Sequence, residues 1–209
     1  MTALKEKLEL DEITPNKLAL VGRSAGAHLA LRYGYGAHQE GSPPISTTSP
    51  IPVKLIVADV GPTDATDAAD FFGAGMDWNV SPEKAYPLLS SLLGTEVPVI
   101  DWNAIPANIL GLLEKASPVS YVSQNTPPTL LRYAEHDNMV PASQGDKLKA
   151  ALEASNKWED VDFNLFHFPN SGHNLDSIST PVEDSALYQY YWTTYDWYFN
   201  EYMIGEPED

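Results

Sequence analysis

The sequence contains no cysteine and few basic residues, and it has no long apolar segment. Without cysteine, the chain can form neither disulfide bonds nor thiolate metal sites, and the redox state of its compartment stays open. Its 12 Lys and Arg residues against 29 Asp and Glu residues give a formal net charge of −17. This balance argues against nucleic acids and anionic membranes as partners, and it makes a highly anionic substrate unexpected.

No apolar run in the sequence approaches the length of a membrane span, so we expect no membrane-spanning segment. The first residues, Met1–Lys5, do not form a signal peptide. We therefore favour a cytoplasmic location, although a leader lost upstream would leave no trace here. With 209 residues, 43% of them hydrophobic, the chain can bury a core, and we expect one domain over residues 1–209.

Apolar strand patterns alternate with helical patterns along the chain. This alternation predicts the α/β class, with a mostly parallel sheet flanked by helices. Residues 63–125 interrupt the alternation with scattered helical patterns among Pro and Gly, and we interpret them as an inserted helical cap over the site. The predicted strands are Lys17–Val21, Val53–Val60, Pro128–Tyr133 and Val161–Phe168, and the predicted helices are 3–10, 25–35, Ala85–Leu93, Ile105–Lys115, Gln144–Ala154 and Asp184–Tyr202.

The segment Gly22–Gly26 reads Gly-Arg-Ser-Ala-Gly and directly follows the first predicted strand. The pattern Gly-x-Ser-x-Gly is typical of a nucleophile elbow, in which small residues let a strand turn sharply into a helix. The serine, here Ser24, is then held exposed in a strained backbone conformation. The alternative interpretation is a glycine-rich turn without a catalytic role.

Two further polar residues lie just past predicted strands, Asp137 after the third and His173 after the fourth. Because the carboxyl ends of parallel strands meet at one edge of a sheet, Ser24, Asp137 and His173 can gather there. In such a triad the histidine takes the serine proton, and the aspartate holds the imidazole in the required tautomer. The chain order Ser, Asp, His differs from the orders in chymotrypsin and subtilisin.

Other acids and histidines compete for these roles. Glu135 is the alternative acid, and Asp64 is a minor candidate for a direct role. The histidines lack the spacing of metal ligands and the acids match no calcium loop, so we expect neither metal nor cofactor. We expect the remaining histidines, His28, His38, His136 and His167, in structural or surface positions.

The backbone N–H of Ala25, which follows the nucleophile, is the expected oxyanion donor. Phe71, Phe72 and Trp78 lie in the predicted cap, where they would line an acyl or alcohol pocket. An equally good interpretation is that these aromatic residues form a small core of the cap itself.

Together these segments resemble the esterase/lipase branch of the α/β-hydrolase superfamily, in particular bacterial carboxylesterases of the hormone-sensitive-lipase and feruloyl-esterase groups. The resemblance covers roughly residues 14–200 and implies a serine carboxylesterase that cleaves small to medium neutral esters through an acyl-enzyme. It also favours Asp137 over Glu135, because Asp-x-x-Val-Pro matches the family. The matching segments are Lys17–Ala30, Val60–Asp64, Ala116–Val119, Pro127–Leu131, Asp137–Pro141 and Gly172–His173.

The sequence differs from the family pattern in the segment before Ser24. Members carry further strands and a His-Gly-Gly-type oxyanion loop there, whereas only 23 residues precede Ser24. We therefore expect about four parallel strands, with Lys17–Val21 at an edge. That edge would pair with a second copy or with a complementing N-terminal segment, or leave the chain poorly soluble. Gly73–Gly75 is an alternative source of the second oxyanion donor.

Two other functions are compatible with the same residues. A peptidase of the prolyl-oligopeptidase type has the same triad order, although such enzymes usually carry a propeller domain that is absent from this sequence. The other alternative is a non-catalytic remnant, a piece of an α/β-hydrolase that folds or assembles without turnover.

Overall fold

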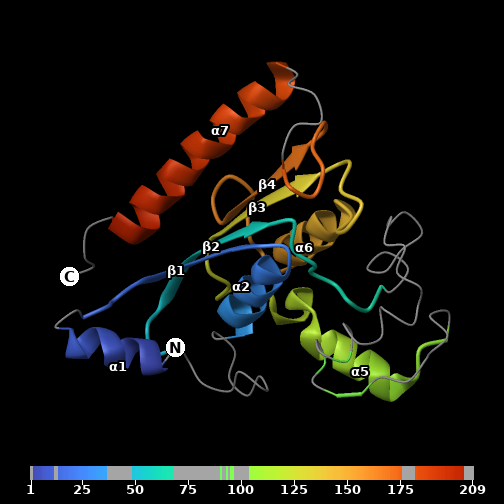
Figure 1. Cartoon of the computed structure of the whole chain (residues 1–209), viewed down its shortest axis with the longest axis horizontal. Coiled ribbons are helices and arrows are strands. Elements are labelled where there is room, and N and C mark those ends of the chain that lie inside the picture. The colour runs from blue at the N-terminus through green and yellow to red at the C-terminus, as the bar shows by residue number, and fades with distance from the viewer. Residues whose placement is uncertain are drawn as a thin grey trace.

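The computed structural model describes residues 2–11, 14–36, 49–67, 90, 93, 95–96, 104–175 and 182–204. A four-stranded parallel sheet of order β1-β2-β3-β4 forms its centre (Figure 1). The α/β class predicted from the alternating patterns is therefore confirmed. The strands are β1 (Leu18–Arg23), β2 (Val53–Asp59), β3 (Thr129–Ala134) and β4 (Phe163–Phe168).

Helices cover both faces of the sheet. Each strand lies beside the next one in the sequence, and the helices α2 and α6, which follow β1 and β3, pack in one core on the same face of the sheet. Helix α7 follows the last strand and covers the other face (Figure 1). The helices are α1 (Thr2–Leu10), α2 (Ala25–Gly36), α5 (Ala107–Ala116), α6 (Ser143–Ala154) and α7 (Val182–Phe199), with a 3-10 helix η1 (Pro118–Tyr121) and a π-helical turn η2 (Asn200–Ile204).

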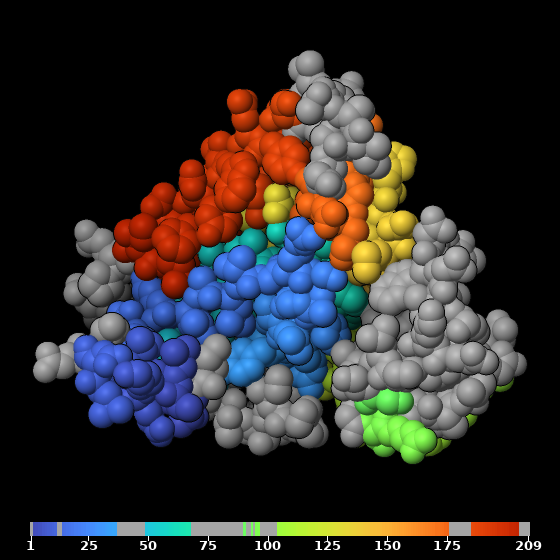
Figure 2. All heavy atoms as spheres, viewed as in Figure 1, coloured from blue at the N-terminus to red at the C-terminus, as the bar shows by residue number. Residues whose placement is uncertain are grey.

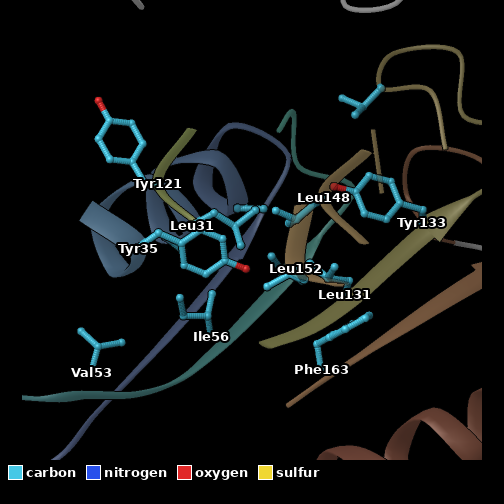
Figure 3. Packing of buried hydrophobic residues seen from close by; sticks show 14 residues of the cluster. Leu31, Tyr35, Val53, Ile56, Tyr121, Leu131, Tyr133, Leu148, Leu152 and Phe163 are labelled. Atoms are coloured by element: carbon cyan, nitrogen blue, oxygen red, sulfur yellow. The ribbon is translucent and has the colours of Figure 1, made fainter. Parts of the chain in front are cut away.

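One apolar core lies between the sheet and the pair α2 and α6. Leu31 and Tyr35 of α2 meet Leu148 and Leu152 of α6 over the middle of the sheet, as Figure 3 shows. The hydroxyl of Tyr35 donates to Thr129 Oγ1 at 3.1 Å, so the polar end of this buried ring has a partner. This core holds α2, and with it the elbow, against the sheet.

A second core on the opposite face is largely aromatic. Tyr191 of α7 packs on Phe166 and Phe168 of β4, and Tyr198 of α7 belongs to the same buried cluster as residues of the neighbouring strands. The rings of Phe166 and Tyr191 meet edge-to-face with centroids 5.4 Å apart, an orientation that aromatic pairs favour. The last helix is therefore held on the sheet largely by aromatic side chains.

Some element boundaries differ from the predictions. Strand β1 continues to Arg23, because its pairing with β2 continues to Asp59. Helix α5 begins two residues later than predicted, because the residue before a proline disfavours helical dihedrals and Pro106 is the N-cap. Strand β4 begins at Phe163 and not at Val161, since the N–H groups of Val161 and Asp162 donate to the Trp158 carbonyl oxygen and form a turn.

Most of one predicted helix lies outside the described residues. The helix predicted over Ala85–Leu93 is described at residues 90 and 93 only. The cap over 63–125 stays a prediction. Its described ends meet, because the Val119 N–H donates to the Thr63 carbonyl oxygen at 3.2 Å.

Strand β1 lies at one edge of the described sheet, as predicted. Its face is partly uncovered, with Val21 65% exposed. Helix α1 has no buried residue and protrudes at the lower left of the molecule in Figure 2. Among the helices in the described ranges, none has both the length and the apolar character that a membrane crossing requires.

Candidate active site

Ser24 occupies the turn between β1 and α2. Its φ of 54° is in the left-handed region, which a residue with a side chain adopts at a cost. Two backbone hydrogen bonds hold this conformation: the Ser24 N–H donates to the carbonyl oxygen of Asp59 at 2.8 Å, and the Ser24 carbonyl oxygen accepts from the His28 N–H at 3.1 Å. The predicted elbow geometry is therefore present, fixed by β2 on one side and by the first turn of α2 on the other.

The two glycines of the motif have different steric roles. A Cβ on Gly22 would lie 2.3 Å from the carbonyl oxygen of Gly26 and 2.6 Å from the nitrogen of Ala27. Both are backbone atoms of α2, so a side chain at Gly22 would push the helix away from the strand. A Cβ on Gly26 meets no described atom within 4 Å. The close approach at Gly22 is what lets the strand turn directly into the helix.

The structure brings Ser24, His173 and Asp137 together. His173 Nε2 lies 3.0 Å from Ser24 Oγ, and His173 Nδ1 lies 2.8 Å from Asp137 Oδ2. These three residues follow β1, β4 and β3, at the carboxyl ends of strands that all run in the same direction (Figure 1). Both distances are within normal hydrogen-bonding range.

Asp137 is held by its own loop. Its Oδ1 accepts the backbone N–H groups of Met139 at 2.7 Å and Val140 at 2.9 Å, and its side chain is 0% exposed. This leaves Oδ2 for His173. An ionised carboxylate only accepts, so the Nδ1 atom of His173 carries the proton and its Nε2 can accept from the Ser24 hydroxyl. The arrangement can therefore remove a proton from Ser24 Oγ.

The loop that carries His173 is anchored on both sides. Before it, the buried Ser171 accepts the His136 N–H through its carbonyl oxygen at 3.1 Å. After it, Leu175 packs in the aromatic core and adopts φ 55°. His173 and Asn174 span the distance between these two anchors.

The competing residues lie elsewhere. Glu135 Oε1 is 2.6 Å from His167 Nδ1, and the other ring nitrogen of His167 is 3.2 Å from Asp146, so Glu135 belongs to a separate surface cluster. His136 is exposed. In the part of the chain that the structure describes, no group of three or more His, Asp or Glu side chains is arranged to hold a metal ion.

His28 and Asp64 both hold local structure. His28 is 5% exposed and its Nδ1 donates to the Pro62 carbonyl oxygen at 3.0 Å. Burial lowers the pKa of His28, an effect that the Pro62 hydrogen bond opposes and that the positive charge of Arg32 reinforces. Asp64 accepts from the N–H and the hydroxyl of Thr66 at 2.9 and 2.6 Å.

Ala25 is the first residue of α2, and the amides of a first helical turn have no acceptor within the helix. This N–H belongs to the residue that follows Ser24, and its role as the oxyanion donor stays a prediction. Several other predicted site residues lie outside the described residues. These are the pocket residues Phe71, Phe72 and Trp78, the alternative donor segment Gly73–Gly75, and His38.

The sequence reasoning missed a buried amide that shapes the loop after β2. The Gln144 side-chain oxygen accepts the N–H groups of Thr63 and Asp64, each at 2.8 Å, and Gln144 is 0% exposed. The Thr63 hydroxyl donates to the Gln144 carbonyl oxygen. Gln144 thereby fixes the loop over residues 61–67 against the start of α6. A polar residue on the inner side of an amphipathic helix is the signal that could have found it.

The structure also reveals an ion pair beside the elbow. Arg132 Nε donates to Asp59 Oδ1 at 2.9 Å, Nη2 donates to Oδ2, and the guanidinium carbon lies 4.4 Å from the Tyr191 ring centroid. Burial lowers the pKa of Arg132, but the hydrogen bonds and charge of Asp59 outweigh it, so the pKa is raised overall. Asp59 follows the apolar residues Leu55–Ala58 at the end of β2, and a charge in such a place needs a partner. That charge was the signal in the sequence.

The sequence matches the family described as BD-FAE over residues 4–152, more than half of the chain. The chain belongs to the BD-FAE family. This BD-FAE chain is 26% identical over 166 residues to the esterase LipQ of Mycobacterium tuberculosis, a match that covers 79% of this chain and 34% of LipQ. It is 26% identical over 193 residues to the acylamino-acid-releasing enzyme of Mus musculus, covering 91% of this chain and 22% of that enzyme.

A truncated form of a carbohydrate esterase from gut microbiota has a similar structure, with a TM-score of 0.59 at 18% sequence identity. The match covers 95% of this chain and 64% of that chain. The BD-FAE chain thus has the α/β-hydrolase fold and belongs to the esterase branch of that superfamily of serine hydrolases. It spans about a third of the length of LipQ and less than a quarter of the mouse enzyme.

Proposed function

We propose that this chain carries the catalytic triad of a serine esterase, with Ser24 as nucleophile, His173 as base and Asp137 as the orienting acid. The observation that carries the proposal is the continuous hydrogen-bonded path from Ser24 Oγ through the His173 ring to Asp137, with distances of 3.0 and 2.8 Å. An unassisted hydroxyl is a poor nucleophile, and this path supplies the base that it needs.

The reaction has two halves. His173 Nε2 takes the Ser24 proton while Oγ bonds to the ester carbonyl carbon, and the Ala25 N–H donates to the negative oxygen that forms. The protonated His173 then gives its proton to the departing alcohol, which leaves an acyl group on Ser24. In the second half, His173 activates a water molecule that releases the acid and restores the serine.

The proposed substrates are small to medium neutral carboxylic esters. The net charge of −17 disfavours a strongly anionic substrate, because the surface would repel it. Similarity to an esterase and to a carbohydrate esterase supports ester over amide cleavage. Phe71, Phe72 and Trp78 stay our candidates for the wall of the acyl or alcohol pocket.

A peptidase is the second candidate, since the chain also resembles an acylamino-acid-releasing enzyme over 91% of its length. The third is a non-catalytic remnant or assembly piece of an α/β-hydrolase, in which the three side chains would lie together without turnover. Amide hydrolysis needs the same triad, so the geometry around Ser24 does not separate the first two. Substrate preference separates them.

The experiment compares hydrolysis of p-nitrophenyl acetate and butyrate with hydrolysis of an aminoacyl p-nitroanilide, for the wild-type chain and for Ser24→Ala. We expect the esters to be the better substrates and Ser24→Ala to lower their turnover by at least about 10³-fold. A fluorophosphonate should label the wild type and not Ser24→Ala. Faster nitroanilide cleavage would favour the peptidase, and a wild type that neither labels nor turns over would favour the remnant.

We also propose that the outer edge of β1 pairs with another strand, from a second copy or from a complementing N-terminal segment. Within the described sheet, β1 has a neighbour on one side only, and its pairing with β2 is regular from Ala19 to Arg23, after a register shift between Leu18 and Ala19. This stretch contains no proline, so the backbone groups of its outer edge can accept a further strand. Sedimentation equilibrium of the purified chain tests for the second copy. A stable monomer with ordinary esterase turnover would contradict both forms of this proposal.

A further inference from the structure

A second hydrogen bond joins the elbow to the histidine loop, beside the bond between Ser24 and His173. Arg23 Nη2 donates to Asn174 Oδ1 at 2.6 Å, although 151 positions separate the two residues in the sequence. Arg23 directly precedes Ser24, and Asn174 directly follows His173. The bond therefore runs alongside the one that the proposed mechanism uses.

We propose that Arg23 and Asn174 are positioning residues, which hold His173 at hydrogen-bonding distance from Ser24. This inference rests on the proposed function and extends it to two residues that do not touch the reacting atoms. The pair acts through the loop of His173, not on the substrate.

The backbone of Arg23 is held more firmly than that of Asn174. Arg23 is the last residue of β1 and pairs in register with Asp59, so its backbone is part of the sheet. Asn174 is exposed and lies between the anchors Ser171 and Leu175, where the loop carries His173 across the site. Among the described residues, the side-chain hydrogen bonds from the elbow to this loop are Arg23 to Asn174 and Ser24 to His173. The guanidinium thus gives the loop a second fixed point on the sheet.

A bond of this kind matters more for catalysis than for folding. Exposed polar pairs contribute little to folding stability, because water replaces either partner at small cost. Catalysis is more sensitive, since displacement of a reacting group by about 1 Å can lower a rate by roughly 10²-fold. The pair should therefore affect turnover without affecting the melting temperature.

The test uses Arg23→Gln, Asn174→Ala and the double variant, with Lys7→Gln as matched control. Lys7 also donates one side-chain hydrogen bond at an exposed site, to Asp11 at 3.2 Å in α1, so this variant loses the same charge far from the elbow. We expect each single variant to lower kcat for p-nitrophenyl butyrate about tenfold with KM unchanged. The double variant should be no slower than the worse single one, because both remove the same bond. The control should match the wild type.

Conservative variants separate positioning from a merely structural role. Arg23→Lys keeps a donor and Asn174→Asp keeps the acceptor, so each should retain kcat within about threefold of the wild type. Recovery of kcat in these two variants, against its loss in Arg23→Gln and Asn174→Ala, is the result that a positioning role requires.

Amide hydrogen exchange of residues 169–175 provides a readout that does not depend on activity. Exchange should be faster in Arg23→Gln and Asn174→Ala than in the wild type and the control. A wild type that fails to react with a fluorophosphonate overturns the proposed function and, with it, this inference. A wild type that reacts, beside Arg23→Gln and Asn174→Ala variants with wild-type kcat and exchange, overturns this inference alone. An increase in KM for Arg23→Gln, with Asn174→Ala silent, would overturn it in favour of direct substrate binding by Arg23.

Discussion

The amide N–H of Ser24 donates to the carbonyl oxygen of Asp59 at 2.8 Å, so the backbone of β2 fixes the turn at the end of β1. The end of β2 is joined to β3 in the same way, because the Val60 N–H donates to the Arg132 carbonyl oxygen at 2.8 Å. The side chains of Asp59 and Arg132 then pair with each other. The position of the proposed nucleophile therefore depends on three adjacent strands.

Asp59→Asn should destabilise the protein by leaving the charge of Arg132 without its partner. The two side chains are only 13% and 12% exposed, so the unpaired guanidinium is poorly solvated. We expect the free energy of unfolding to fall by about 2 kcal/mol, and the melting temperature by roughly 4 to 8 °C. Asp11→Asn is the control, since it breaks the exposed pair with Lys7 and should shift the melting temperature by no more than about 1 °C. Equal shifts in both variants would show that the buried pair contributes nothing beyond an ordinary surface pair.

Asp137→Asn should lower esterase turnover by about 10³-fold or more while the fold stays intact. The carbonyl oxygen of the new amide can still accept the N–H groups of Met139 and Val140, which turns its NH₂ group toward His173 Nδ1. His173 would then carry its proton on Nε2, where it faces Ser24 and cannot accept. Steady-state kinetics and circular dichroism measure the two effects.

Glu135→Gln is the matched control for Asp137→Asn, because Glu135 contacts His167. It should leave turnover within about twofold of the wild type. If Glu135→Gln is damaging and Asp137→Asn is silent, the acid has been assigned to the wrong residue.

Gly22→Ala should destabilise the protein by about 2 kcal/mol or more, because the new methyl group would overlap backbone atoms of Gly26 and Ala27. Those atoms belong to α2 and cannot rotate away as a side chain would. Gly26→Ala adds the same methyl group where no described atom lies within 4 Å, and alanine favours a helix, so its melting temperature should equal or exceed that of the wild type. Thermal unfolding measures both, and a Gly22→Ala protein as stable as the wild type would mean that the elbow can relax around the methyl group.

His28 should make the protein less stable as the pH falls below about 6.5. Burial lowers the pKa of His28 in the folded state, whereas the unfolded chain takes up the proton near the ordinary histidine value of about 6.5. Below that pH the unfolded state binds more protons, so stability is lost as the pH falls, by at most about 1.4 kcal/mol per pH unit for this one group. Urea unfolding at pH 7.5 and 5.5 should show a larger loss for the wild type than for His28→Gln. Equal losses would show that His28 takes up its proton without unfolding.

The sequence predicted the strands and the proximity of Ser24, Asp137 and His173, because both leave local signals. The run Leu55–Ala58 is apolar on both faces, as a central parallel strand requires, and it forms the middle of β2. Ser24, Asp137 and His173 each follow such a run, and strand ends in a parallel sheet meet at one edge. The proximity of these three residues follows from the topology, whereas their catalytic roles stay proposals.

The sequence did not predict the contacts that support the site. Gln144 meets Thr63 across 81 positions, and Arg23 meets Asn174 across 151. Hydrophobic periodicity reports which face of an element is buried, but it does not report which polar group on another element lies opposite. The late start of β4 has a similar cause, since Val161 favours a strand by itself while Asp160 and the backbone around Trp158 form a turn.

The parallel sheet also separates the molecule into two ends. Ser24, Asp137 and His173 follow the carboxyl ends of their strands, whereas the turn before β4 lies at the amino end. Trp158 in that turn is 68% exposed, and the chain contains no cysteine. Trp158→Cys would therefore give the protein a single thiol at the end opposite the proposed nucleophile. Through that thiol the chain can be attached to a bead or an electrode with its reactive end turned toward the solution.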